Sequence, residues 1–343
     1  MPENKNQIKK IMCLYPRTIE NPKYKPNDKN KGNIPRMIDP RLKYIEIPCG
    51  KCYQCRKQKG RDWAIRMSNE MKRDKDEHFV LLTISDKWYD EIKTKYKLET
   101  ANDVAKKAVR LTLARVIKKT GKSVKHWLVT ELGHTNTERI HMHGIIWNPK
   151  NFLDAWKDNS LCNDNGIIGE AGIQYTVKYM TKLDTDHREY KAITLCSSRL
   201  GSNWLDGYNR TNNIFKGKNT NQSIRMSNGC KVAMPIYYRN KIYNDREREK
   251  LRINKLNENI GYIGKWKYKL DDHIEKERLL EEARHLAREY ESDDYYKYIK
   301  KKYIDKINNR QKNVSFGNLN EELINEIDND KWLKMYNERN NIF

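Results

Sequence analysis

Hydrophobic and polar positions in the first third of the chain follow two different periods. Trp63, Met67 and Met71 recur at every fourth position, a spacing typical of one face of a helix. The run HFVLLTIS at 78–85 is short and apolar and contains β-branched residues, so it predicts a buried strand. The pattern therefore predicts a helix followed directly by a strand.

A second helical pattern spans about 101–119. Thr100 and Asp103 have the spacing of a capping box, with Asp in place of the usual Glu, which predicts where the helix begins. Gly121 suits the position just after the helix end, because glycine readily adopts the left-handed conformation found there.

Two further strands are predicted beyond this helix, HWLVTEL at 126–132 and RIHMHGIIW at 139–147, joined by the turn GHTNTE. The segment GEAGIQYTVKYMTK at 169–182 opens with small residues and then shows helical spacing. Helix, strand, turn and strand in this order favour an α+β fold class. We expect a mainly antiparallel sheet with helices on one face.

The chain divides into three regions by composition. Residues 1–60 combine prolines with turn-forming Asn, Asp and Gly, which predicts irregular structure. Residues 61–245 carry the strand and helix patterns, and 246–343 read as charged amphipathic helices with one thin apolar stripe. This last region is expected to be a solvated helical appendage, and a role as a partner-binding or DNA-clamping arm stays open. The stripe consists of Leu279, Ala283, Leu286 and Tyr290.

Charge narrows the possible partners. The chain has 69 Lys and Arg against 46 Asp and Glu, a net charge of +23. Such an excess attracts polyanions, of which nucleic acid is the commonest in a cytoplasm. A lysine-rich composition inherited from an AT-rich genome explains many lysines but not an imbalance this large. No run approaches the ~20 apolar residues of a membrane span, and no apolar signal segment follows the N-terminus. We expect a cytoplasmic protein without membrane contact, with reduced cysteines.

The predicted strand at 139–147 carries a candidate metal site. His141 and His143 flank Met142, so both imidazoles point to the same face of an alternating strand. An antiparallel pairing across the turn could bring Glu131 beside them. Two imidazoles and a carboxylate suit a catalytic Mn²⁺ or Mg²⁺ that acts as a Lewis acid. The alternative is a pair of ordinary surface histidines.

A candidate nucleophile site follows in 169–182. Tyr175, Lys178, Tyr179 and Lys182 share one face of a short helix by their spacing. A phenol can attack phosphorus, and a nearby ammonium stabilises the phenolate and phosphate charges. The alternative is an amphipathic helix whose tyrosines pack on the sheet.

Cysteines cluster near the N-terminus. Cys49, Cys52 and Cys55 form a C-x2-C-x2-C pattern, and Cys13 lies upstream. Four thiolates would complete a structural Zn²⁺ site where residues 1–60 have too little apolar content to fold by burial. An iron–sulfur cluster is less favoured, because the usual fourth cysteine after a close spacer is absent. Three unconnected reduced thiols are the remaining interpretation.

Several motifs in order carry a resemblance to a known family. FVLLTIS, TELG with HMHGIIW, and YTVKYMTK resemble the three motifs of HUH replication initiators. PCGKCYQCRKQKGRDWAIRM, SSRLGSNWL and MPIYYRNKIY are more closely similar to the initiators of microviruses, small single-stranded-DNA phages, and particularly of the gokushovirus branch. The likeness covers residues from about 10 to 245.

The resemblance implies an HUH endonuclease-type antiparallel sheet with flanking helices for 61–245. It implies that His141 and His143 bind the catalytic metal, with Glu131 as the third ligand. The Cys-containing segment and the charged helical tail are then additions to this nuclease domain.

The resemblance also implies a reaction. Tyr175 and Tyr179 would be paired nucleophiles, with Lys178 between them. One tyrosine would nick single-stranded origin DNA, leaving a 3′-hydroxyl primer and a 5′-phosphotyrosine, and the second would act when the strand is rejoined after rolling-circle synthesis. The expected partners are origin DNA and the host helicase and polymerase, in the cytoplasm of a bacterial host.

Other classes of protein share parts of this pattern. A non-catalytic DNA-binding protein would keep the charge but has no need of tyrosines facing a metal. A histidine-nucleophile phosphohydrolase would want a third alternating histidine, where this chain has Ile145. A plasmid-mobilising HUH relaxase usually carries its histidine motif after the tyrosine, and here the histidines come first.

Overall fold

In the computed structural model, the chain divides into two compact units, residues 1–291 and 292–343. All described residues belong to the first unit. They are residues 13–288 except 29, 134–137, 170–171, 174–175, 178–186, 188 and 227–228, with the backbone alone at Asn209.

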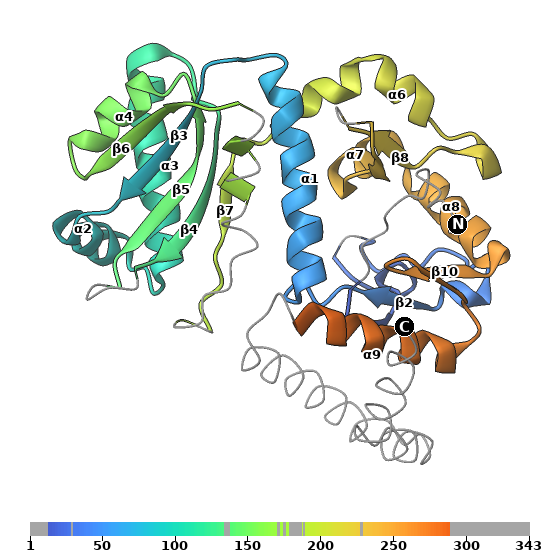
Figure 1. Ribbon diagram of the computed structural model, residues 1–343. Coiled ribbons are helices and arrows are strands. Elements are labelled where there is room, and N and C mark those ends of the chain that lie inside the picture. Colours follow the sequence, from blue (N-terminus) through green and yellow to red (C-terminus); the bar gives the residue numbers. More distant parts are fainter. Residues whose placement is uncertain are drawn as a thin grey trace, which may run out of the picture. The chain divides into compact units, whose positions relative to one another are not determined.

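A five-stranded sheet is formed by strands within residues 61–245, the region in which the sequence predicts strands (Figure 1). Its strand order is β6-β3-β5-β4-β7, and every neighbouring pair is antiparallel. The prediction of an α+β fold with an antiparallel sheet is therefore confirmed. The strands are β3 (Glu77–Thr83), β4 (His126–Leu132), β5 (Ile140–Trp147), β6 (Cys162–Ile167) and β7 (Thr194–Cys196).

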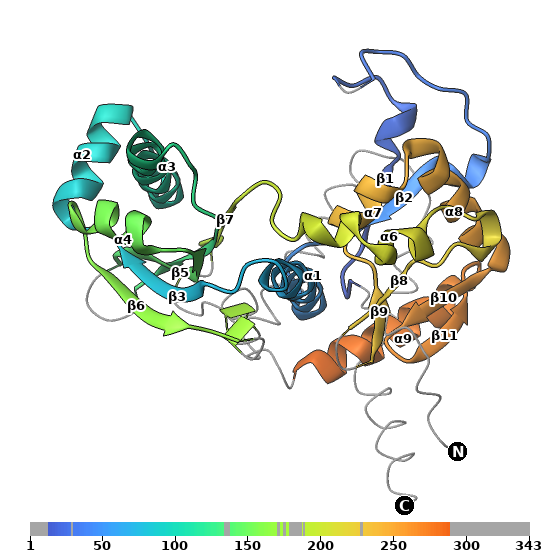
Figure 2. The same ribbon diagram turned by 90° about the horizontal axis from the view of Figure 1, so that it is seen from above.

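One face of this sheet is covered by three helices, as Figure 2 shows. Val80, Leu82 and Met142 are fully buried on it. The predicted helix at 101–119 is confirmed as α3: the Thr100 side chain accepts a hydrogen bond from the Asp103 backbone, and Gly121 has φ 73° just after the end. The three helices are α2 (Asp86–Tyr96), α3 (Ala101–Thr120) and α4 (Lys150–Lys157).

The opposite face packs partly against helix α1 (Tyr53–Met71), which begins before the periodic stretch noted in the sequence. Ala64 and Met67 of α1 share an apolar cluster with the sheet. Alternation along β4 and β5 explains this second core, because odd-numbered side chains point away from α3. The sheet contributes Trp127, Val129, Ile145 and Trp147 to the cluster.

Helix α1 also packs against the segment that follows the sheet. Arg66 is buried, donates from Nε to the Leu200 carbonyl at 3.0 Å, and lies over the rings of Trp63 and Tyr237 at 4.1 and 3.9 Å. Ile65 joins a third apolar cluster in this segment. The segment comprises η3 (Ser202–Asp206), α6 (Tyr208–Asn213), η4 (Gly217–Asn219), β8 (Ser223–Arg225), β9 (Lys231–Ala233) and α7 (Ile236–Ile242).

The N-terminal region contacts the last described helices. Lys23 forms an ion pair with Glu249 at 2.8 Å, and Arg284 donates from Nε to the Leu14 carbonyl at 2.9 Å. Regions far apart in the sequence therefore pack together here. The elements are β1 (Arg17–Glu20), η1 (Pro22–Tyr24), η2 (Pro40–Leu42), β2 (Tyr44–Ile47), α8 (Asp245–Glu258) and α9 (His273–Ala287).

A hairpin between α8 and α9 departs from the purely helical region predicted after residue 245. Its strands are β10 (Ile260–Ile263) and β11 (Trp266–Lys269), joined by a two-residue turn in which Gly264 has φ 58°. Each strand has only four residues, so its signals in the sequence are short: the alternation of Trp266 and Tyr268 with lysines in β11 and the glycine of the turn. Within the described residues, no helix has the length and apolar content needed to cross a membrane.

Candidate metal centre

Glu131, His141 and His143 come together on the sheet face opposite α3. The Nε2 atom of His143 lies 3.1 Å from Oε2 of Glu131, and that of His141 lies 3.5 Å from the same oxygen. One possible ligand atom from each of the three residues lies within 4.8 Å of the others. The structure therefore brings these three side chains together across the β4–β5 hairpin, as the sequence predicts.

Strand register explains this convergence. Glu131 pairs directly with His141, and Val129 pairs with His143. Residues that pair directly, or lie two positions apart on one strand, have side chains on the same face. A shift of one residue would move Glu131 to the face covered by α3, so the site depends on the hairpin register.

The histidine rings are oriented by contacts behind them. Nδ1 of His141 lies 3.3 Å from the Arg139 carbonyl oxygen, which favours a proton on Nδ1 and leaves the lone pair of Nε2 available to a metal ion. The ring of His143 stacks on Phe79, with centroids 6.3 Å apart. Sequence reasoning did not identify Arg139 or Phe79, although both follow the strand alternation of the histidine face.

The three donors are partly open to solvent. Their side chains are 21% exposed for His141, 13% for His143 and 16% for Glu131. A three-donor set of this kind leaves coordination positions for water or substrate, as a catalytic ion requires. The residues present thus fit Mn²⁺ or Mg²⁺, and the binding of the metal stays a prediction.

A polar network fixes β4 one residue before Glu131. Thr130 is buried and donates from its hydroxyl to the Asn102 side chain at 2.8 Å. The Tyr190 hydroxyl donates to Thr130 at 2.7 Å, and the Ile193 backbone N–H donates to the same oxygen at 3.0 Å. The network joins α3 and the chain before β7 to the strand that carries Glu131. No motif in the sequence pointed to Tyr190.

The predicted nucleophiles Tyr175 and Tyr179 and the lysine between them, Lys178, lie outside the described residues. Of the same segment, Ile173 and Val177 are described, and both are buried in the apolar cluster shared by α1, β4 and β5. Thr176 is also buried and donates from its hydroxyl to the Gly172 carbonyl at 2.8 Å. The described parts of the segment are therefore anchored to the sheet face that holds the metal donors.

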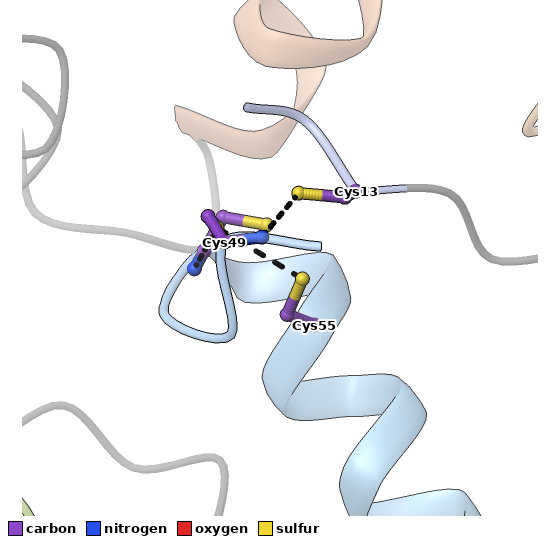
Figure 3. Close-up of side chains that lie close together, drawn as sticks. Cys13, Cys49 and Cys55 are labelled. Atoms are coloured by element: carbon purple, nitrogen blue, oxygen red, sulfur yellow. Dashed lines mark hydrogen bonds between the residues drawn. The ribbon is translucent and has the colours of Figure 1, made fainter. Parts of the chain in front are cut away.

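The predicted cysteine cluster is assembled at the N-terminus of α1 (Figure 3). The sulfur atoms of Cys13, Cys49, Cys52 and Cys55 all lie within 4.8 Å of one another. A hydrogen bond with Cys13, together with those from the neighbouring thiols, lowers the pKa of the Cys49 thiol. All four are free thiols, so the structure brings together the set expected for zinc, and zinc itself stays a prediction.

Comparison with known proteins gives two findings. The model of the family "Replication-associated protein ORF2/G2P" matches residues 77–184, which include β3 and the three donors. The chain is also 24% identical over 230 residues to the replication-associated protein VP4 of Bdellovibrio phage phiMH2K, covering 59% of this chain and 69% of that protein. The resemblance to a microvirus rolling-circle replication protein is confirmed. No solved structure matches the chain significantly.

Proposed function

We propose that this protein starts rolling-circle replication of a phage genome by nicking single-stranded origin DNA through tyrosine transesterification. The observation that carries the proposal is the cluster of Glu131, His141 and His143, partly open to solvent on one face of an antiparallel sheet. The replication-associated family match covers the same residues. We propose that the sheet and its helices form an HUH-type nuclease domain.

Glu131, His141 and His143 would hold a divalent cation, Mn²⁺ or Mg²⁺. When bound, such an ion supplies Lewis-acid polarisation of the scissile phosphate. The contact of His141 with the Arg139 carbonyl and the stacking of His143 on Phe79 hold both rings in place before DNA binds. Preorganisation of this kind keeps the donor geometry constant during the reaction.

Tyr175 or Tyr179 would attack the phosphorus atom. The phenol loses its proton as its oxygen forms a bond to phosphorus, the bond from phosphorus to the 3′-oxygen breaks, and that oxygen takes up one proton as a free 3′-hydroxyl, so that protons balance. The DNA is left joined to the enzyme as a 5′-phosphotyrosine. Lys178 would stabilise the charge on the phenolate and the phosphate. Because one phosphodiester replaces another, the reverse reaction rejoins the strand, and the second tyrosine can take part in that step.

The anchoring of the segment on both sides supports its role. Before and within it, Ile173 and Val177 belong to the apolar cluster that includes Val129 of β4. After it, Tyr190 and Ile193 hydrogen-bond to Thr130 of β4. Both flanks of the tyrosine-bearing segment are thus tied to the strand that carries Glu131.

The net charge of +23 supports DNA as the substrate, because phosphate neutralisation dominates such binding. The free 3′-hydroxyl would be extended by a host polymerase, with a host helicase separating the strands. The reaction would take place in the cytoplasm of the infected bacterium.

The test is cleavage of labelled single-stranded DNA from the cognate genome, followed on denaturing gels. Wild type, Tyr175→Phe, Tyr179→Phe and the double variant are compared in Mn²⁺ and in EDTA. The expected result is a metal-dependent covalent adduct that persists in at least one single variant and is lost in the double variant. Tyr208→Phe serves as the matched control, because Tyr208 is exposed and lies outside the matched residues.

The other outcomes separate the competing classes. An adduct abolished by one single variant alone would keep the nicking reaction but remove the role of the second tyrosine. DNA binding without an adduct in any metal would overturn the proposal in favour of a non-catalytic DNA-binding protein.

A further inference from the structure

We propose that Cys13, Cys49, Cys52 and Cys55 bind one zinc ion in a closed structural site that folds the N-terminal region onto helix α1. The proposal is independent of the nicking reaction. It rests on the distances between the sulfur atoms, on the groups that surround them, and on the small number of buried apolar side chains between Cys13 and Cys49.

The distances fit a tetrahedral zinc site. A bond length of about 2.3 Å to each thiolate places the sulfurs of a regular tetrahedron about 3.8 Å apart. The sulfurs of Cys49 and Cys55 are 3.9 Å apart, and all four lie within 4.8 Å of one another. An iron–sulfur cluster places its thiolates outside several metal atoms and therefore needs a wider arrangement. Four protein donors also leave no open position, which is the mark of a structural rather than a catalytic zinc.

The surroundings favour thiolates. Backbone N–H groups point at the sulfurs: that of Cys49 lies 3.1 Å from Sγ of Cys13 (Figure 3), and that of Cys52 lies 3.3 Å from Sγ of Cys49. Cys52 occupies the position just before α1, a helix of 19 residues, and Cys55 lies in its first turn. The positive end of the helix dipole stabilises negative charge there. Four thiolates with one Zn²⁺ carry a net charge of −2, so these contacts stabilise the loaded site.

The chain between Cys13 and Cys49 is held mainly by polar contacts with α8 and α9 and buries few apolar side chains. Neither β1 nor β2 contains a buried residue, and their pairing gives only a four-residue hairpin ladder. The buried apolar side chains described between Cys13 and Cys49 are Leu14, Tyr15 and Leu42. Cys13 and Cys49 are 36 positions apart, just outside the short β1–β2 ladder, so the ion would close a long loop that this ladder alone joins by backbone pairing.

The donor chemistry separates this site from the histidine cluster. Thiolates are soft ligands that select zinc, whereas a carboxylate with imidazoles accepts Mn²⁺ or Mg²⁺. The two clusters are therefore expected to hold different metals at the same time. This difference in ligand preference allows the metal of one cluster to be removed while the other cluster keeps its metal.

The test is the metal content of the full chain, purified without a metal-affinity tag or chelator and measured by mass spectrometry of the elements. We expect one zinc per chain, retained through gel filtration in millimolar EDTA. Exchange of this zinc for Co²⁺ on the wild type should give the intense visible absorption of tetrahedral cobalt thiolate. Iron with a brown chromophore, or less than about a tenth of a zinc after incubation with added Zn²⁺, would overturn the proposal.

The ligand set is tested by single Cys→Ser variants. Cys13→Ser is the most informative variant, because it distinguishes zinc bound by four cysteines from zinc bound by the three cysteines of the C-x2-C-x2-C pattern alone. We expect it to lower zinc content at least tenfold after EDTA and to change the cobalt spectrum. Cys230→Ser, an exposed cysteine outside the cluster, is the matched control and should retain full zinc. An unchanged zinc content in Cys13→Ser would contradict the four-ligand site.

The histidine cluster provides the second control. His141→Ala should leave the zinc content and the cobalt spectrum as in the wild type, because His141 lies on β5 and its site contains no cysteine. If the cysteine variants fail to fold, the wild-type zinc content and the cobalt spectrum still decide the proposal. Loss of nicking with zinc intact would refute only the proposed reaction, and loss of zinc with nicking intact would refute only this inference.

Discussion

The two donor clusters of this protein are held in opposite ways. Glu131, His141 and His143 stand on three strand positions whose backbone is fixed by hydrogen bonds and by apolar cores on both sheet faces. The four cysteines lie where the chain has few buried apolar residues, and they are joined by contacts among themselves. The sheet site is therefore expected to exist before metal binds, whereas the cysteine site is expected to need its ion in order to form.

The comparison shows that the amount of buried apolar packing around the donors determines whether a metal ion is expected to have a catalytic or a structural role. Where packing already defines the donor geometry, the ion is free to leave open positions for a substrate. Where packing is scarce, binding free energy of the ion becomes folding free energy. Four variants or treatments would sharpen this contrast or break it.

The largest effect is expected for His141→Ala. Losing one of three donors should reduce the rate of adduct formation at least 1000-fold, about 4 kcal/mol of transition-state stabilisation, while the thermal midpoint changes by no more than a few degrees. The rate is measured by single-turnover nicking and the midpoint by calorimetry. His273→Ala, at the exposed start of α9, should keep both values. A large fall in the midpoint of His141→Ala would show that the sheet site is not preformed.

Gly144→Ala should damage the sheet site through its backbone. A Cβ atom at Gly144 would lie 2.1 Å from the Trp127 carbonyl oxygen and 2.7 Å from the Leu128 Cα, so β4 and β5 would have to separate. We expect a loss of about 3 kcal/mol or more in the free energy of unfolding, as for severe overpacking, measured by urea denaturation. Gly169→Ala, where an added Cβ meets nothing within 4 Å, is the control. Wild-type stability in Gly144→Ala would contradict the pairing of these strands.

Removal of zinc should loosen one region alone. After the cysteine site is emptied, amide hydrogen exchange in β1 and β2 should become at least tenfold faster, about 1.4 kcal/mol of lost protection. The central strands β3, β4 and β5 should be unchanged, because their cores contain no cysteine ligand. Exchange is followed by mass spectrometry with and without zinc. Equal changes in both regions would mean that the two sites are not independent.

The smallest effect is a pH dependence in the sheet. Burial lowers the pKa of His126, which lies at the start of β4, so the folded state binds its proton less readily than the unfolded chain. Stability should therefore fall as the pH decreases below about 6.5, by about 1 kcal/mol at pH 5.5. In His126→Gln this fall should be smaller, and in His273→Gln it should match the wild type. Urea unfolding at pH 7.5 and 5.5 measures it; equal falls in all three proteins would exclude His126 as the cause.

Local features were predictable from short stretches of sequence. The cap at Thr100, the glycine at 121 and the alternation that puts His141 and His143 on one face each depend on residues only a few positions apart. Helix α2 and hairpin β10–β11 were not predicted, although Trp88, Ile92 and Tyr96 recur at every fourth position in α2 and β11 alternates aromatic residues with lysines.

Tertiary structure decided which of these features meet. The sequence by itself determined the kinds of donor, the α+β class and the common face of the two histidines. Only the folded chain put Tyr190 against Thr130 and Arg284 against Leu14. The physical reason is that helices and strands follow from interactions between near neighbours in the chain. Contacts between distant segments depend on the packing of whole faces, which no short pattern specifies.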